Sequence, residues 1–172
     1  AGATMDALGL LCRMPLDWGA CGEELRSRVG PAIAGQPAGA LSLESVVTVV
    51  AALGEQGLEG DGMGQCIAII RDQPCKLASL PVAAILRLAI AATKSLSIAS
   101  GLLDAIAGAA TAVLESCSME DLSKMLLAMA KAKCGSESRA TAHFFGQAAR
   151  AITPKLSTLS TVQLIKVMLA IG

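Results

Sequence analysis

Apolar residues recur at helical spacing in four segments of the chain. In each segment they fall at positions i, i+3, i+4 and i+7, which is the pattern of one buried face on an α-helix. The segments are LSLESVVTVVAALG (41–54), LPVAAILRLAIAATK (80–94), CSMEDLSKMLLAMAK (117–131) and LSTLSTVQLIKVMLAIG (156–172). Residues that favour a first helical turn stand near the starts of three of them, namely Ser42, Pro81 and Ser118. We therefore predict four amphipathic helices.

The four segments align with one another at nearly even steps. When Val46, Ile85, Leu122 and Leu164 are placed in register, the other apolar positions of the segments also coincide. These anchors are 39, 37 and 42 residues apart, which is the size of a repeat made of two helices. The phrase RDQPCKLASL (71–80) returns 79 residues later as RAITPKLSTL (150–159), which is two periods away.

Second helices, rich in Ala and Gly, are predicted between the first ones. We place them at about 20–29, 63–73, 99–114 and 137–152, with loops at 30–40, 54–62, 74–79, 95–98, 134–137 and 153–158. The stretch 3–13 is interpreted as a degenerate first helix. Leu77, Leu114 and Leu156 recur after the second helices and are predicted to plug the space between helices.

The predicted fold is all-α, an α-solenoid of about four to five antiparallel helical hairpins with a period of about 37–42 residues. It forms one helical-repeat domain over 1–172, because a single hairpin cannot bury its apolar face without its neighbours. The hairpins are approximately 1–34, 41–75, 80–115 and 117–152, followed by a last helix at 159–172. We expect that last helix to leave an apolar face uncovered, which a partner or a further segment would cover.

Composition supports helices and argues against several functional classes. Hydrophobic residues make up 53% of the chain and aromatic residues 2%, with no Tyr, so aromatic strand formers are almost missing. Lys+Arg and Asp+Glu are both 14, so the chain lacks the basic field of a typical nucleic-acid binder. Zero net charge and a mean hydropathy of +0.60 favour association with partners. The longest uncharged run, between Arg28 and Glu44, is broken by Gly and Pro, so no transmembrane helix is expected.

No catalytic, cofactor or metal site is predicted. The one histidine, His143, is interpreted as structural, and GLEGDGMG (57–64) as an interhelix loop, because it lacks the Lys-Ser/Thr of a phosphate-binding loop. The six cysteines contain no C-x-x-C pair. We interpret them as small buried hydrophobes of a reducing compartment, with a disulfide framework as the alternative. The expectation is a protein that is not an enzyme.

One position is a candidate for contacts with RNA or with a partner. Two residues after each anchor stand Thr48, Arg87, Lys124 and Lys166. In stacked hairpins these would form a column with neighbours about 10 Å apart. A basic column can follow a phosphate backbone, whereas the alternative interpretation is a row of ordinary solvent-facing cations.

The pattern S-x-x-x-L-x-x-x-L/M-x-A-x-A/G, found in SMEDLSKMLLAMAKA (118–132) and STVQLIKVMLAIG (160–172), resembles the organellar α-solenoid families. These are the octotricopeptide and heptatricopeptide repeat proteins and the helical arrays of RAP-domain proteins. The resemblance covers most of the chain from about 41 onward. The Trp and Pro common in octotricopeptide units are missing from the first helices here, and no RAP domain is recognised.

The resemblance implies a protein of a mitochondrion or plastid, soluble or peripherally attached, and a start at Ala1 rather than Met fits removal of a targeting peptide or a trimmed chain. Members of these families bind organellar RNA or serve in organellar ribosomes, and related arrays are accessory subunits of larger complexes. The preferred hypothesis is a non-catalytic scaffold subunit whose partners are other proteins of a large organellar complex. The alternative is an organellar RNA-binding repeat protein, either a mitochondrial ribosome component or an RNA-processing factor.

Overall fold

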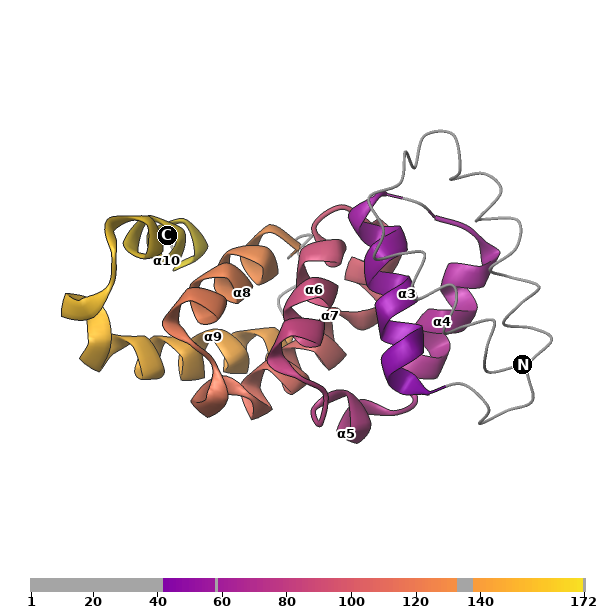
Figure 1. The fold of residues 1–172 in the computed structure, drawn as a ribbon, viewed down its shortest axis with the longest axis horizontal. Helices are drawn as coiled ribbons and strands as arrows, with labels where there is room; N and C mark the ends of the chain where they lie inside the picture. The colour runs from indigo at the N-terminus through magenta and orange to yellow at the C-terminus, as the bar shows by residue number, and fades with distance from the viewer. Residues whose placement is uncertain (1–41, 58, 133–137, 172) are drawn as a thin grey trace.

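The computed structural model describes residues 42–57, 59–132 and 138–171 (Figure 1). Within these ranges all regular elements are helical and no strand occurs, which confirms the predicted all-α class. The predicted first helices correspond to α3 (Leu43–Glu55), α6 (Val82–Ala92), α8 (Met119–Ala132) and α10 (Thr161–Ile171). The second helices correspond to α4 (Asp61–Arg71), α7 (Leu96–Ala112) and α9 (Arg139–Ile152). The helices predicted at 3–13 and 20–29 lie outside the described residues.

Helices that occupy the same place in the repeat lie side by side. Helix α3 packs against α6, α6 against α8, and α8 against α10, while α4 packs against α7 and α7 against α9. Consecutive helices also contact each other, as in the pairs α3/α4, α6/α7 and α8/α9. Figure 1 shows the described elements following one another along the long axis, from α3 in indigo to α10 in yellow. Each first helix therefore covers the next one along the chain.

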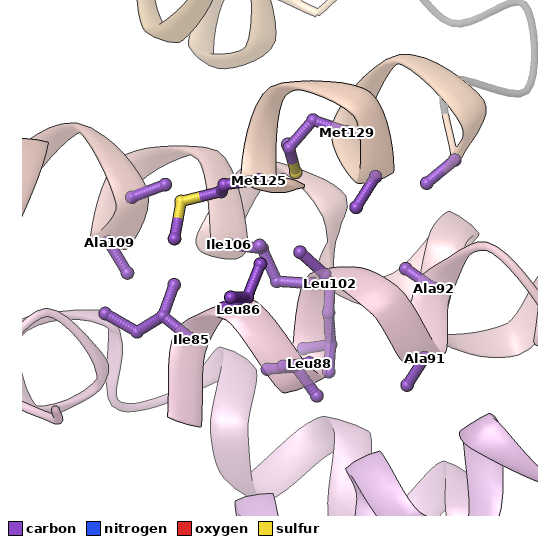
Figure 2. Packing of buried hydrophobic residues seen from close by; sticks show 14 of the residues in the cluster. Ile85, Leu86, Leu88, Ala91, Ala92, Leu102, Ile106, Ala109, Met125 and Met129 are labelled. Atoms are coloured by element: carbon purple, nitrogen blue, oxygen red, sulfur yellow. The ribbon is translucent and has the colours of Figure 1, made fainter. Parts of the chain in front are cut away.

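The helices share one continuous apolar core. The anchors Val46, Ile85 and Leu122 are buried, and Leu164 is half-buried and packs against the same core. In Figure 2, Met125 lies near Ile85, and side chains of α6, α7 and α8 meet around them. Burial of one such side chain contributes about 1.5–3 kcal/mol relative to leaving it in water. The fold buries the apolar stripe that the sequence shows in α3, α6 and α8, but in α10 it buries only Val167, while Met168 and Ile171 of the predicted stripe are 70% and 56% exposed.

Small residues allow the helices to approach closely. A Cβ placed on Gly54 of α3 would lie 2.9 Å from the Cβ of Ala91 on α6 and 2.3 Å from Cδ1 of Ile98 on α7. A Cβ on Gly101 of α7 would lie 2.7 Å from Cγ2 of Ile67 on α4. Because all three distances are below normal contact, a side chain at either glycine would force the neighbouring atoms to move.

Serine side chains cap the starts of five described helices, Ser95 and Ser160 through N–H···Oγ hydrogen bonds of 3.3 Å, and the sequence predicts two of these starts, at Ser42 and Ser118. The Oγ atoms of Ser42, Ser118 and Ser138 accept hydrogen bonds from backbone N–H groups three residues later, at 3.1, 3.1 and 3.0 Å. Ser118 also donates to the Asp121 carboxylate at 2.7 Å. These bonds satisfy N–H groups that have no partner within the helix. The starts of α3, α8 and α9 are thus encoded locally.

The turns differ from the expected loops. The stretch predicted as a loop at 74–79 contains a short helix, α5 (Pro74–Leu77), and the loop predicted at 153–158 is the 3₁₀ helix η2 (Thr153–Thr158). A further 3₁₀ turn, η1 (Leu114–Ser116), follows α7. The loop predicted at 95–98 is shorter, because Ser95 caps α7 and the helix begins at Leu96. Proline suits the first turn of a helix, which explains how Pro74 and Pro154 sit within helical turns.

Only one of the three predicted plugs is fully buried. Leu77 is 0% exposed, because α5 packs against α7. Leu114 is half-buried at the end of α7. Leu156 is 44% exposed, so its prediction as a plug is wrong. The reason is that η2 packs mainly against the preceding α9, with no helix like α7 over it in the described part of the chain.

Candidate functional site

The first two members of the predicted column share a hollow between α3 and α6. Thr48 and Arg87 both line this open hollow, whose volume is about 290 Å³. Arg87 donates two hydrogen bonds to the Glu55 carboxylate, from Nε at 3.2 Å and from Nη2 at 3.0 Å. The Thr48 hydroxyl donates to the backbone carbonyl of Glu44 at 2.9 Å. The single cation at this place is therefore held by a carboxylate from the neighbouring first helix.

The other two members lie near one glutamate. Lys124 Nζ is 2.6 Å from Glu120 Oε1, one helical turn earlier on α8. The hydrogen bond from Lys124 lowers the pKa of Glu120, and the charge of Lys166 on α10 lowers it further. The same hydrogen bond raises the pKa of Lys124. The four predicted residues therefore fall into two groups, Thr48 with Arg87 and Lys124 with Lys166. A glutamate lies beside each group, Glu55 beside the first and Glu120 beside the second.

Helix α10 presents a second apolar face to solvent. Val167 is buried against the core, whereas four large side chains on the other side of α10 are more than half exposed. They are Val162 (60%), Ile165 (51%), Met168 (70%) and Leu169 (68%), and we call them the α10 stripe. Large apolar side chains gathered on one exposed helix face are typical of an interaction surface. This surface is the strongest candidate site on the described part of the molecule.

An open apolar groove continues from the α10 stripe. Its volume is about 400 Å³, and it runs between the ends of α8 and α10 and one face of α9. We call it the terminal groove, and it is lined by Ala130, Ala142, Phe145, Ala149, Leu169, Ala170 and Ile171. None of these residues is charged, and four of them are alanines. Leu169 belongs to both the stripe and the groove, so the two form one surface.

A polar hollow lies on the second-helix side, between the end of α7 and α9. It has a volume of about 600 Å³ and is lined in part by Glu115, His143, Arg150 and Lys155. His143 is exposed, while its neighbour Phe144 is fully buried, so the histidine does not have the structural role predicted from the sequence. Phe144 carries that role instead, in an edge-to-face contact with Phe145 at 5.5 Å between ring centroids.

The described cysteines are free thiols that differ in burial. Cys66, Cys75 and Cys117 are free thiols, and burial raises the pKa of the Cys66 thiol to about 12. In the described ranges, no three His, Cys, Asp or Glu side chains are placed to hold a metal ion. Nor does any described helix have the length and apolar character needed to span a membrane. Cys12, Cys21 and Cys134 lie outside the described residues.

Two glutamates that sequence reasoning missed carry the polar contacts between repeats. Glu55 forms an ion pair with Arg87, and Glu59 accepts hydrogen bonds at the first turn of α7. Glu59 accepts hydrogen bonds from the Ser97 N–H at 3.1 Å, the Ser97 hydroxyl at 2.9 Å and the Ser95 hydroxyl at 3.0 Å. These bonds, led by the one from the Ser97 N–H, lower the pKa of Glu59. The partners are 32 to 38 residues apart, so no local pattern reveals them.

The comparisons with known proteins return no match. No family model, no curated protein and no solved structure is significantly similar to this chain. The function must therefore be argued from the surfaces described above.

Proposed function

We propose that this protein is a non-catalytic helical-repeat scaffold, an accessory subunit that docks other proteins within a large organellar complex. The observation that carries the proposal is the exposed apolar surface made by the α10 stripe and the terminal groove. Apolar surface that remains in contact with water is costly, at about 25 cal/mol per Å². Docking of a partner protein removes this cost, whereas RNA offers few apolar groups with which to do so.

The proposed architecture is an α-solenoid, the arrangement in which repeats contact only their neighbours. The serial packing of α3, α6, α8 and α10 supports it, as does the parallel series of α4, α7 and α9. Such arrays present long surfaces and act chiefly by binding. The organellar location rests on the family resemblance of the repeat and is part of the proposal.

The paired charges weigh against RNA as the main ligand. Arg87 and Lys124 each have a carboxylate within 3.0 Å, so a phosphate would have to compete with Glu55 or Glu120. Counterion release, which drives most binding to nucleic acid, requires cations that can neutralise phosphates. We interpret the Arg87–Glu55 pair as a contact between α3 and α6, and the Lys124–Glu120 pair as a solvent-facing pair within α8.

The affinity for RNA across a salt series tests the proposal. We expect weak binding of a short mixed-sequence RNA, with almost no dependence on salt between about 50 and 200 mM. An RNA-binding protein with several phosphate contacts would instead lose roughly 10³–10⁵ in affinity over that range. Replacing Lys124 or Arg87 by Ala would then lower the salt slope by about one each. A steep slope that these two variants reduce would overturn the scaffold in favour of RNA binding.

A further inference from the structure

The polar hollow beside α9 has two sides of different charge. Helix α9 and η2 supply one side of its lining, with Arg150 and Lys155, whereas α7 and η1 supply the other, with Thr111 and Glu115. The two cations and the glutamate are exposed to solvent. A volume of about 600 Å³ falls within the range of small-molecule sites. The hollow therefore has the size and the charge to hold a small anionic ligand.

The two cations of the hollow have no carboxylate partner. In the described ranges, Arg87 and Lys124 each form an ion pair with a glutamate, whereas neither Arg150 nor Lys155 forms one. Two cations that line one hollow repel each other, and an anion bound between them would remove this repulsion. Arg150 and Lys155 can therefore bind an anion without giving up a carboxylate, unlike Arg87 and Lys124.

The repeated phrase shows why Lys155 lacks a partner. Lys155 in RAITPKLSTL stands 79 residues after Lys76 in RDQPCKLASL. The Lys76 ammonium donates a hydrogen bond to the Gln73 side chain at 3.0 Å. In the later copy the place of Gln73 is taken by Ile152, which is apolar and buried. The second copy of the phrase thus keeps the cation and loses the group that binds it in the first.

Two further polar side chains of α9 line the hollow, although the packing of the repeat does not require them. His143 and Gln147 stand about two turns and one turn before Arg150, on the same side of the helix. The residues 79 positions earlier, in α4, are Gly64 and Ala68. Histidine and glutamine side chains can both donate hydrogen bonds to an anion. The helix dipole favours a cation in the last turn of α9, which accounts for Arg150 but not for these two.

The hollow lies on the other side of α9 from the terminal groove. At about 100° per residue, His143, Gln147 and Arg150 project roughly opposite to Phe145 and Ala149, which line the groove. A helix packed in the terminal groove would therefore leave the hollow open. The inference drawn from the hollow does not depend on what covers α10.

We infer that this hollow binds a small phosphomonoester that also carries hydroxyl groups. A phosphomonoester has a charge of about −1.5 to −2 at pH 7, which suits two cations better than the single charge of a phosphodiester does. The Arg150 guanidinium can pair with two phosphate oxygens, and the Lys155 ammonium adds a second charge. On the other side of the hollow, the Glu115 carboxylate repels the phosphate and accepts hydrogen bonds from hydroxyl groups, which orients the ligand. This site goes beyond the scaffold function, because it requires no partner protein.

Amide NMR spectra of the ¹⁵N-labelled 172-residue protein test the inference. The probes are inorganic phosphate and ribose 5-phosphate, added at constant ionic strength, and ribose as the probe without phosphate. We expect both phosphates to shift the amide signals of 111–115 and 143–155 saturably, and ribose to leave them in place. Ribose 5-phosphate should bind at least about threefold more tightly than inorganic phosphate, because its hydroxyl groups add hydrogen bonds.

Matched variants locate the binding. Arg150→Ala should weaken the binding of both phosphates at least about tenfold, because hydrogen bonds between charged groups are the strongest. Arg139→Ala is the control, since Arg139 is an exposed cation at the start of the same helix and does not line the hollow, and it should change neither affinity by more than about twofold. Glu115→Ala should tighten the binding of inorganic phosphate by removing a like charge, and it should reduce the advantage of ribose 5-phosphate. The amide spectra of the three variants check that the fold is intact.

Three outcomes would overturn the inference. The first is that neither phosphate shifts the signals saturably, or that both bind the Arg150→Ala protein as tightly as the original. The second is that dimethyl phosphate, a phosphodiester, binds more tightly than ribose 5-phosphate, which would assign the hollow to a nucleic-acid backbone. The third is that ribose 5-phosphate keeps its full advantage in Glu115→Ala, because the hydroxyl groups would then have no contact with Glu115.

Discussion

At the scale of single residues, Gly54 determines how closely α3 can approach its neighbouring helices. The nearest atom to a Cβ on Gly54, Cδ1 of Ile98, lies at the end of a flexible side chain. The Cβ of Ala91, at 2.9 Å, belongs to a short side chain that cannot rotate away. The space at this position is therefore smaller than a methyl group, and helix α3 can lie against α6 and α7 only because Gly54 has no side chain.

Gly54→Ala should lower the free energy of unfolding by about 1–3 kcal/mol, the usual cost of overpacking a core. Gly108→Ala is the matched control, because a Cβ at that position on α7 meets no atom within 4 Å. It should raise stability by about 0.5–1 kcal/mol, because the unfolded chain has less conformational freedom with alanine than with glycine and therefore loses less entropy on folding. Urea denaturation of the two variants measures both effects. A Gly54→Ala protein as stable as the original would show that the helices can separate without cost.

The described cysteines should differ strongly in reactivity. Cys75 is exposed, whereas Cys66 is 0% exposed and burial raises the pKa of its thiol to about 12. Because the thiolate is the reactive form, a thiol reagent at neutral pH should modify Cys75 rapidly and Cys66 only after unfolding. Mass spectrometry of the labelled protein, with and without denaturant, identifies the modified residues. Equal labelling of the two in the native protein would contradict the burial of Cys66.

The residue scale is also where sequence reasoning was weakest. The positions of Thr48, Arg87, Lys124 and Lys166 followed from the repeat, but their partners did not. Lys124 pairs with Glu120 at i,i+4 spacing, which the sequence could have shown. Glu55 lies 32 residues from Arg87, and only the packing of α3 on α6 brings them together. A candidate basic column therefore appeared more basic in the sequence than it is in the fold.

At the scale of elements, Glu59 joins the segment before α4 to the first turn of α7. It accepts three hydrogen bonds at the first turn of α7, where a negative charge also interacts favourably with the helix dipole. Glu59→Gln should therefore cost about 0.3–1 kcal/mol of stability at pH 7, with the small value expected because the side chain is exposed to solvent. Glu115→Gln is the control, since Glu115 is an exposed glutamate at the other end of α7.

The pH dependence of this contact has a definite sign. The pKa of Glu59 is lower in the folded protein than its ordinary value of 4.5. The contact therefore stabilises the fold above about pH 4.5 and is lost as the pH falls through the lower folded pKa. Thermal unfolding measured from pH 7 down to acid should show the difference between the original protein and Glu59→Gln shrinking to nothing. A difference that grows on acidification would assign the loss to another cause.

Helix periodicity predicted the described long elements because each spans several turns, and local start signals at Ser42 and Ser118 support the starts of α3 and α8. Helix α8 runs from Met119 to Ala132, and the prediction was 117–131. The short elements were missed for the opposite reason. Helix α5 has four residues, too few to show a period, and it is held by packing of Leu77 against α7. The exposure of Leu156 could not be predicted either, because it depends on what packs over η2.

At the scale of the whole molecule, stability should be graded along the series of helices. If the helices form the proposed solenoid, each repeat is stabilised by its two neighbours, and the described helix with one such neighbour should be the weakest. Helix α6 packs against α3, α7 and α8, and six of its 11 residues are buried. Helix α10 packs mainly against α8 and buries only Val167. Helices α6 and α10 thus have similar sequence patterns, but packing stabilises α6 much more than α10.

Hydrogen exchange measured by mass spectrometry should resolve this gradient. We expect amides of α10 to exchange at least about tenfold faster than those of α6, because α10 can open locally while the core stays folded.

Leu88→Ala, at a fully buried site in α6, should cost about 2–5 kcal/mol and speed exchange in α3, α6 and α8 together. Val167→Ala should speed exchange in α10 and leave α6 unchanged. Uniform protection in all helices would instead indicate one cooperative globule, and the serial arrangement would then have no energetic meaning.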